Sequence, residues 1–339
     1  MNRMLQPSPR PVLLRDNRRL CAAQLARAKA ICDEALEWVR DREAYIERHA
    51  VDRRFALPDA NWSHDAPNEF VRLFQRVAQA DAQTLAHFRG LAQVFSGYSL
   101  YRVCNGYGFS AATMELSATL DQEIAERLAQ QNRIHIEDWR RMTNGLPRRF
   151  LFTPPALLGE VGHEVDGVIV NSDTCTYQER INLVYASGLA DWLDEKLKTS
   201  GAVRVAEIGG GYGALCHWFM QAYPGASYTI IDLPESLLFS RLYVSLSWPN
   251  LATTVGLERA HQGVRFVPNY MAEQLPERFD LVINTLSMSE MSDYQIRRYA
   301  DLIKRAWLKD GGFFFRTKPG QPQGRPAMRR ASVTAGVSV

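Results

Sequence analysis

The sequence predicts an α/β protein in which a helical N-terminal domain precedes a parallel β-sheet with helices on both faces. Up to about residue 130, apolar side chains recur at helical spacing and strand signals are scarce. From about residue 200, short apolar runs alternate with helical stretches, which is the pattern of a parallel sheet. These runs are apolar at nearly every position, as expected for strands that are buried on both faces.

The N-terminal part is predicted to be a short arm followed by helices. Residues 1–16 are rich in Pro and Arg and are expected to be disordered, and residues 17–150 are assigned to a helical domain. The expected helices start near residues 18, 68, 85 and 110, with a loop over 53–62 that contains a proline. These helices are also candidates for the contact of a homodimer.

The C-terminal part, residues 151–318, is assigned to the α/β domain. Strands are expected at 168–170, 203–208, 228–231, 264–267, 279–284 and 312–316, and helices at 178–198, 214–223, 236–246 and 294–308. Residues 319–339 are rich in Pro, Gly and Arg and lack a strand period, so they are expected to be a disordered tail.

The composition excludes several classes of protein. Hydrophobic residues make up 46% of the 339 positions and charged residues 23%, as in ordinary globular domains. A net charge of +3 does not favour a nucleic acid as partner, and no stretch is apolar for the roughly 18 residues that a membrane span requires. The five scattered cysteines, with none at C-x-x-C spacing, and the lack of an apolar signal core predict a cytoplasmic protein. No His, Asp and Glu set has metal-ligand spacing, so no metal is expected.

The most informative motif is Glu207-Ile208-Gly209-Gly210-Gly211-Tyr212-Gly213, which lies between an expected strand and an expected helix. Glycines there let the backbone turn sharply and let a ligand approach the main chain. The free N–H groups at the start of a helix favour an anionic group. Asp232 ends the next expected strand, about twenty residues further on, where a carboxylate can bind ribose hydroxyls.

Two classes of cofactor use this geometry. Gly209, Gly211 and Ala214 also satisfy the dinucleotide pattern G-x-G-x-x-G/A. Glu207 favours S-adenosylmethionine, because a carboxylate at this point suits the amino group of a methionine moiety and would repel a pyrophosphate. The motif also lies late in the chain, which leaves little sequence for the second half of a dinucleotide fold.

With these residues in place, the chain resembles the class I S-adenosylmethionine-dependent methyltransferases, and within them the bacterial family described as sugar O-methyltransferases. The resemblance covers roughly residues 95–318. Besides the glycine motif, it rests on the blocks 171–188, 228–235 and 279–291.

The resemblance implies a Rossmann-like domain that binds S-adenosylmethionine. The methionine end would lie at Glu207, Gly209, Gly211 and Gly213, and the ribose at Asp232. Further cofactor contacts implied by the resemblance are Leu233, Asn269, Tyr270, Met271 and Asn284. Arg180 is a candidate partner for the cofactor's carboxylate, and a structural salt bridge is the alternative. Class I domains normally add a helix and an antiparallel pair of strands after the fifth strand, and here these closing C-terminal strands are expected to be missing.

A hydroxyl acceptor needs a base when it attacks the methyl group. Glu290 lies just beyond the strand at 279–284, at the carboxyl edge of the sheet, where the alternative is a charge that only stabilises the start of the next helix. Tyr177 precedes the helix at 178–198, and His163 is expected in a loop, where a solvated histidine is the alternative.

The predicted function is therefore S-adenosylmethionine-dependent methylation of a hydroxyl on a sugar or glycosylated metabolite. The alternatives are methylation of a phenolic metabolite, a degenerate protein that binds the cofactor without catalysis, and an NAD-dependent oxidoreductase. The first three require a site for S-adenosylmethionine, whereas the last requires a dinucleotide site.

Overall fold

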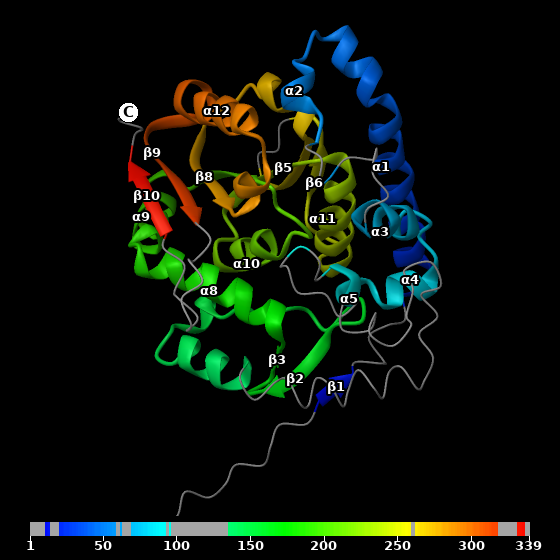
Figure 1. Ribbon diagram of the computed structural model, residues 1–339. Helices are drawn as coiled ribbons and strands as arrows, with labels where there is room; N and C mark the ends of the chain where they lie inside the picture. The colour runs from blue at the N-terminus through cyan, green and yellow to red at the C-terminus, as the bar shows by residue number, and fades with distance from the viewer. Residues whose placement is uncertain are drawn as a thin grey trace, which may run out of the picture. The chain divides into compact units, whose positions relative to one another are not determined.

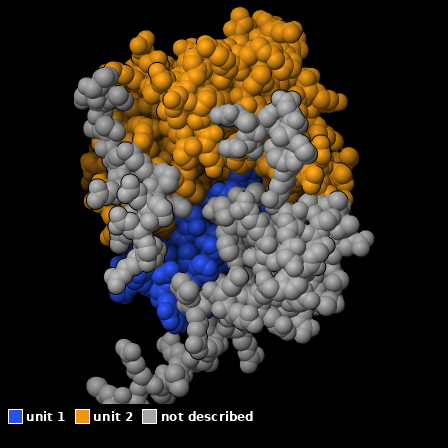
Figure 2. Space-filling model, viewed as in Figure 1, with its two compact units in different colours: residues 1–20, 81–178 blue, residues 21–80, 179–339 orange. Residues whose placement is uncertain are grey.

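A computed structural model describes residues 11–13, 20–58, 62, 69–92, 95, 135–258, 262–317 and 331–335. The chain divides into two compact units, which Figure 2 colours separately: unit 1 comprises residues 1–20 and 81–178, and unit 2 comprises residues 21–80 and 179–339. This division differs from the boundaries expected at 16, 150 and 318. The helix expected from residue 110 lies outside the described residues.

Unit 2 contains a seven-stranded sheet in the order β10-β9-β8-β4-β5-β7-β6 (Figure 1). All neighbouring strands are parallel except β9 and β10. The strands are β4 (Val203–Ile208), β5 (Ala226–Asp232), β6 (Thr253–Val255), β7 (Gly263–Pro268), β8 (Phe279–Thr285), β9 (Leu308–Thr317) and β10 (Ala331–Ala335). The predicted α/β fold with a parallel sheet is confirmed.

The strand order reverses at β4, because β5 and β7 lie on one side of it while β8 and β9 lie on the other. In open α/β sheets, ligands bind at such a switch point, outside the carboxyl ends of the two central strands. The loops that follow β4 and β8 therefore flank the position where this sheet is expected to bind a ligand.

The C-terminal segment corrects one expectation. Residues 319–339 were expected to be a disordered tail without closing strands, but β10 lies within them and pairs antiparallel with β9, with Ala331 opposite Thr317 and Ala335 opposite Phe313. The segment Ala331–Ala335 is only five residues long and mixes small and β-branched residues. A strand that short is specified by its partner more than by its own period.

Helices cover both faces of the sheet (Figure 1). On one face, α10 (Ala214–Ala222) packs against β5, with the Phe219 and Tyr228 rings 5.3 Å apart. On the other face, Tyr299 of α12 (Asp293–Leu302) and Trp307 of the π-helix η7 (Ile303–Trp307) pack in a core with Ile208. The helices α9 (Leu189–Ser200) and α11 (Pro234–Ser247) complete the α/β part.

The N-terminal helices α1 (Ala22–Arg48) and α3 (Glu69–Val77) belong to the same unit as the sheet. Two ion pairs join α1 to α11 of the α/β part: Arg42 pairs with Glu235, and Arg241 pairs with Glu34. The pair between Arg42 and Glu235 is buried on both sides.

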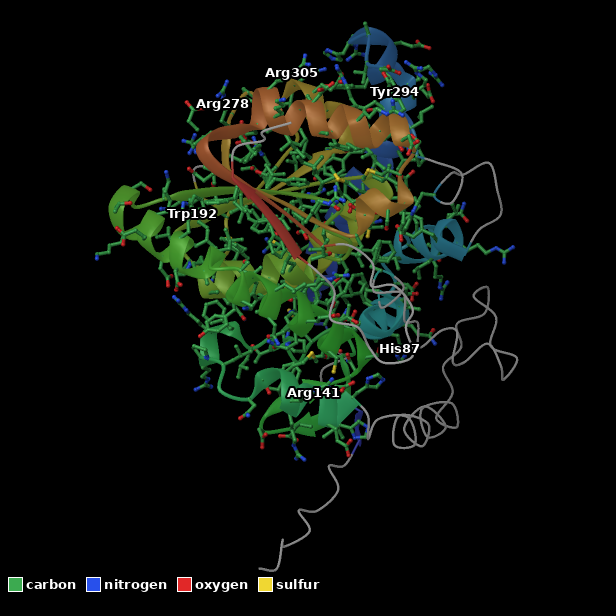
Figure 3. The ribbon with its side chains drawn as sticks, turned by 60° about the vertical axis from the view of Figure 1, so that its left-hand side comes forward. His87, Arg141, Trp192, Arg278, Tyr294 and Arg305 are labelled. Atoms are coloured by element: carbon green, nitrogen blue, oxygen red, sulfur yellow. The ribbon has the colours of Figure 1, made fainter. Side chains whose placement is uncertain are left out.

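The run 53–62, expected to be a loop, begins with the short helix α2 (Arg53–Ala56). Asp52 caps this helix by accepting a 2.9 Å hydrogen bond from the Arg54 N–H. Phe55 is fully buried in the core beneath the sheet, so α2 is fixed by packing rather than by its own length. Tyr294, labelled in Figure 3, also donates its hydroxyl to Asp52.

Unit 1 contains the helices α4 (Ala82–Ala86) and α5 (Phe88–Ala92), a helix over 135–143, and a three-stranded antiparallel sheet of β1 (Pro11–Leu13), β2 (Val161–Val165) and β3 (Val168–Val170). The strand at 168–170 is confirmed, while β1 lies in the arm that was expected to be disordered. Asp166 and Gly167, with φ of 51° and 79°, form the tight turn between β2 and β3.

The helix expected at 178–198 is two helices. The first, α8 (Ser172–Ala186), begins in unit 1 and ends in unit 2, and α9 follows after Gly188, whose φ of 78° ends the first helix. Among the described residues, no helix has the length and apolar character needed to cross a membrane.

A buried charge cluster holds unit 1 together. The Arg89 guanidinium donates to Glu160 at 2.5 Å and to Asp173 at 2.7 Å, and Asn171 donates to Glu160 at 2.9 Å. Burial raises the pKa of Glu160, against the opposing charge of Arg89. Removing one member of such a cluster leaves an uncompensated buried charge, so its role is structural.

Candidate functional site

The glycine motif forms the turn between β4 and α10. Gly209, Gly211 and Gly213 have φ of 74°, 56° and 88°, a region that favours glycine. The turn is held by the Gly209 N–H, which donates to the Ile231 carbonyl at 2.9 Å, and by the Gly213 N–H, which donates to the Gly210 carbonyl at 2.9 Å. The motif is therefore a fixed backbone turn at the switch point of the sheet.

Steric contacts within the protein also require glycine at positions 209 and 210 of the motif. A Cβ atom on Gly209 would lie 2.1 Å from the Ser287 Oγ and 2.2 Å from its Cβ. A Cβ atom on Gly210 would lie 2.6 Å from the Ile230 Cγ2 and 3.2 Å from the Glu207 Oε2. The three distances to Ser287 and Ile230 are too short for a real Cβ contact, so these two side chains exclude a Cβ atom at positions 209 and 210.

Glu207, near the end of β4, is a buried acid beneath this turn. Its Oε2 accepts a 2.9 Å hydrogen bond from the Tyr228 hydroxyl. Burial raises the pKa of Glu207 to about 8, although the Tyr228 hydrogen bond and the charge of Arg180 both lower it. A carboxyl group in this state favours a cationic partner, because a positive charge would restore its ionised form.

Asp232 ends β5 and presents a half-buried carboxyl to the same turn. Its Oδ2 accepts from the Gly211 N–H at 3.1 Å, and its Oδ1 accepts from the Leu233 N–H at 2.8 Å. Burial raises the pKa of Asp232 to about 7 against these bonds, and the charge of Glu290 adds to the rise. A hydrogen bond from the Ser236 side chain also lowers this pKa.

The loop after β8 faces the glycine turn across the switch point. Asn284 donates from Nδ2 to the Ile208 carbonyl at 2.9 Å and to the Ser287 Oγ at 2.5 Å. The Ser287 hydroxyl donates to the same carbonyl at 2.8 Å. Leu286, between them, has a φ of 84°, which is strained for a leucine.

Glu290 ends the 3-10 helix η6 (Ser287–Glu290) at this edge of the sheet and is exposed. Desolvation of the Glu290 carboxyl raises its pKa, while a hydrogen bond with the Trp62 side chain lowers it. The charge of Glu290 also contributes to the raised pKa of Asp232.

The residues expected to contact an adenine lie in the 3-10 helix η5 (Asn269–Gln274), directly after β7. The Asn269 side chain is buried and donates to the Ala56 carbonyl at 2.8 Å. Tyr270 is buried against Tyr45, with ring centroids 5.0 Å apart. Met271 is only partly buried, so it has the most side-chain surface left of the three.

Two of the predicted catalytic residues, Tyr177 and His163, belong to unit 1. Tyr177 is buried in α8 and lies 5.4 Å from the Phe152 ring. The position of His163 is a correction, because this residue was expected in a loop, with a solvated histidine as the alternative, and instead lies buried in β2, opposite Val170 of β3. Gly162 and Glu164, on either side of the histidine, break the apolar pattern of the strand, and its pairing with β1 and β3 is not visible in the local sequence. The catalytic roles of both residues stay predictions.

Three contacts of the site were missed from the sequence: the Tyr228 hydroxyl on Glu207, the Trp62 side chain on Glu290, and the Ser287 side chain on Gly209. The first joins neighbouring strands, and the others join segments that lie far apart in the chain. The parallel register of β4 and β5 explains the first contact. It places Glu207 opposite Ile230, and Tyr228 lies two residues from Ile230 on the same face of β5.

No protein-family model matches the chain, and no curated protein matches it. Solved structures show distant similarity. The pyocyanin biosynthetic protein PhzM is 15% identical, with 76% of this chain and 79% of that chain covered and a TM-score of 0.31. An O-methyltransferase family protein from Burkholderia thailandensis is 12% identical, with 74% and 80% covered and a TM-score of 0.29.

A candidate methyltransferase from Bacillus halodurans C-125 is 20% identical, with 40% of this chain covered and a TM-score of 0.28. The chain spans about half of that protein's length, 52%. Similarities this weak assign neither a family nor a function, so the assignment depends on the site itself.

Proposed function

We propose that this protein is an S-adenosylmethionine-dependent methyltransferase that methylates a hydroxyl group of a sugar or glycosylated metabolite. One observation carries the proposal: two acids lie at the carboxyl ends of adjacent parallel strands, at the glycine turn and the switch point of the sheet. Glu207 is the next-to-last residue of β4, and Asp232 is the last residue of β5. A cofactor with an ammonium group at one end and a ribose beyond it matches this spacing of acids.

The buried acid argues against a dinucleotide. A pyrophosphate at the glycine turn would lie close to the buried Glu207 carboxyl, whose ionisation the charge of Asp232 already disfavours. A pyrophosphate there would gain no positive partner and would raise the cost of ionising Glu207 further. An amino group at the same point would instead pair with Glu207.

Each residue then has a distinct task. Glu207 would accept from the cofactor's ammonium group, Arg180 would pair with its carboxylate, and Asp232 would accept from the two ribose hydroxyls. The adenine would lie by the backbone of η5 and Met271, since Asn269 and Tyr270 are engaged within the protein. Bound S-adenosylmethionine supplies an electrophilic methyl group.

The acceptor hydroxyl needs a base, and Glu290 is the best placed of the predicted candidates. It lies at the carboxyl edge of the sheet, and its raised pKa moves it toward the range in which a carboxylate takes up a proton near neutrality. Tyr177 and His163 remain further candidates.

The test is a calorimetric titration of the purified protein with S-adenosylhomocysteine, with NAD titrated in parallel. Asp232→Ala is the test variant, and Asp301→Ala, which removes an exposed carboxylate from α12, is the matched control. We expect micromolar binding that Asp232→Ala abolishes and Asp301→Ala preserves. The proposal is refuted if the folded wild-type protein does not bind S-adenosylhomocysteine. Binding of NAD would instead indicate an oxidoreductase.

A further inference from the structure

We propose that Ser287 is a positioning residue that holds the loop after β8 against the glycine turn and so preforms the cofactor site. This inference rests on the proposed function, because the site that it describes is the one for S-adenosylmethionine. Ser287 itself would touch neither the cofactor nor the acceptor; it acts through the Ile208 carbonyl and through Gly209.

The first support is a closed set of hydrogen bonds. The Ser287 hydroxyl donates to the Ile208 carbonyl at 2.8 Å and accepts from Asn284 Nδ2 at 2.5 Å, while the same Nδ2 also donates to the Ile208 carbonyl at 2.9 Å. Asn284 and Ile208 are register partners in the sheet. The last carbonyl of β4 is thus bound twice by residues of β8 and its loop.

The second support is steric. The space that a Cβ atom on Gly209 would need is filled by the Ser287 side chain, 2.1 Å away at Oγ and 2.2 Å away at Cβ. Glycine at 209 and serine at 287 are therefore complementary. Part of the glycine pattern that suggests a cofactor exists because one loop of this protein packs against another.

The third support is the strained residue before Ser287. Leu286 has a φ of 84° and a ψ of −28°, a conformation that a leucine adopts only when its surroundings impose it. Its carbonyl accepts from the Ser289 N–H at 2.7 Å and from the Ser289 Oγ at 2.6 Å. These two hydrogen bonds stabilise the turn over residues 286–289, in which the Ser287 side chain lies against Gly209.

The arrangement connects the residues that the proposed function requires. The same short helix carries Glu290, whose charge acts on Asp232, while Asp232 accepts from the backbone of the glycine turn. Fixing Ser287 to Ile208 therefore fixes the acceptor side of the site relative to the methionine side. A preformed site binds more tightly because the ligand does not have to order the loops.

The test compares Ser287→Ala with Ser200→Ala, using S-adenosylhomocysteine as the probe in calorimetry and thermal unfolding for stability. Ser200, at the end of α9, also donates its hydroxyl to backbone carbonyls, at 2.7 Å and 2.9 Å, and is exposed at the opposite edge of the sheet. We expect Ser287→Ala to raise the Kd about 3- to 10-fold, as the loss of about one hydrogen bond implies, and Ser200→Ala to leave it unchanged. Equal affinity in the two variants would overturn the proposal.

A double variant tests the steric part. Gly209→Ala should weaken binding of S-adenosylhomocysteine at least about 10-fold. In Gly209→Ala combined with Ser287→Gly, the loss should be smaller than the product of the two single losses, because the second change removes the side chain that the new methyl meets. Single losses that simply multiply in the double variant would show that Ser287 is not what excludes a side chain at 209. If the wild type binds no S-adenosylhomocysteine, the proposed function fails, whereas binding with a neutral Ser287→Ala refutes the positioning role alone.

Discussion

The protonation state of Glu207 gives a quantitative prediction for cofactor binding. With a pKa of about 8, the Glu207 carboxyl of the free protein is about 90% protonated at pH 7. An ammonium group that binds beside it stabilises the ionised form, so the carboxyl should lose its proton when the ligand arrives. Binding of S-adenosylhomocysteine should therefore release about 0.9 proton from this residue at pH 7, and about half a proton at pH 8.

The perturbation is Glu207→Gln, which keeps the size of the side chain and an acceptor for the Tyr228 hydroxyl but removes the titration. Calorimetric titrations in buffers of different ionisation enthalpy measure the number of protons released. The quantity of interest is the wild-type release minus the variant release, because Asp232, with a pKa of about 7, contributes protons of its own in both proteins. We expect this difference to be about 0.9 proton at pH 7.

Glu195→Gln, which changes an exposed glutamate of α9, is the matched control and should release as many protons as the wild type. A difference near zero between the wild type and Glu207→Gln would refute the reasoning. It would mean either that Glu207 is already ionised in the free protein or that no cation binds beside it.

The remaining predictions concern stability. The pKa of Glu207 rises from 4.5 to about 8 on folding, so the folded protein binds an extra proton, and the contribution of this residue to the free energy of unfolding should fall by on the order of 5 kcal/mol as the pH rises from about 4.5 to 8. Urea unfolding across this range measures the curve. Glu207→Gln should make it less steep by that amount and leave the part that comes from Asp232, whose pKa is raised to about 7. Arg42→Met leaves Glu235 buried without its partner and should lower the unfolding free energy by about 3–5 kcal/mol, whereas a smaller loss in Arg42→Met with Glu235→Leu would identify the unpaired charge as the cause. Phe55→Ala should cost about 3–5 kcal/mol, and a loss below about 1 kcal/mol would show that α2 is not anchored in the core.

The sequence alone predicts the part of the fold in which local signals agree. The segment from β4 to α11 follows the expected bounds closely, since each strand is an apolar run and a glycine or an acid marks its end. The two acids of the site, Glu207 and Asp232, are found in the same way. Both lie at the ends of strands whose parallel pairing places them at one edge of the sheet.

The rest depends on partners that lie far away in the chain. The strand β2 is missed because His163 and Glu164 break its apolar pattern, and only its pairing with β1 and β3 defines it. The role of Ser287 is invisible for the same reason, because it depends on a turn 79 residues away at Ile208. Long-range pairing, rather than composition, decides these features.

The division of the chain also has a consequence for biosynthesis. Unit 2 is interrupted in the sequence, so α1 emerges from the ribosome long before its partner α11, and 193 residues separate Arg42 from Glu235. At a synthesis rate of about 5–20 residues per second, α11 is made roughly 10–40 s after α1, and until then it cannot cover the buried face of α1. During that interval the nascent chain exposes Ala28, Ile31, Cys32 and Ala35, which are buried in the finished protein, and is open to chaperone binding.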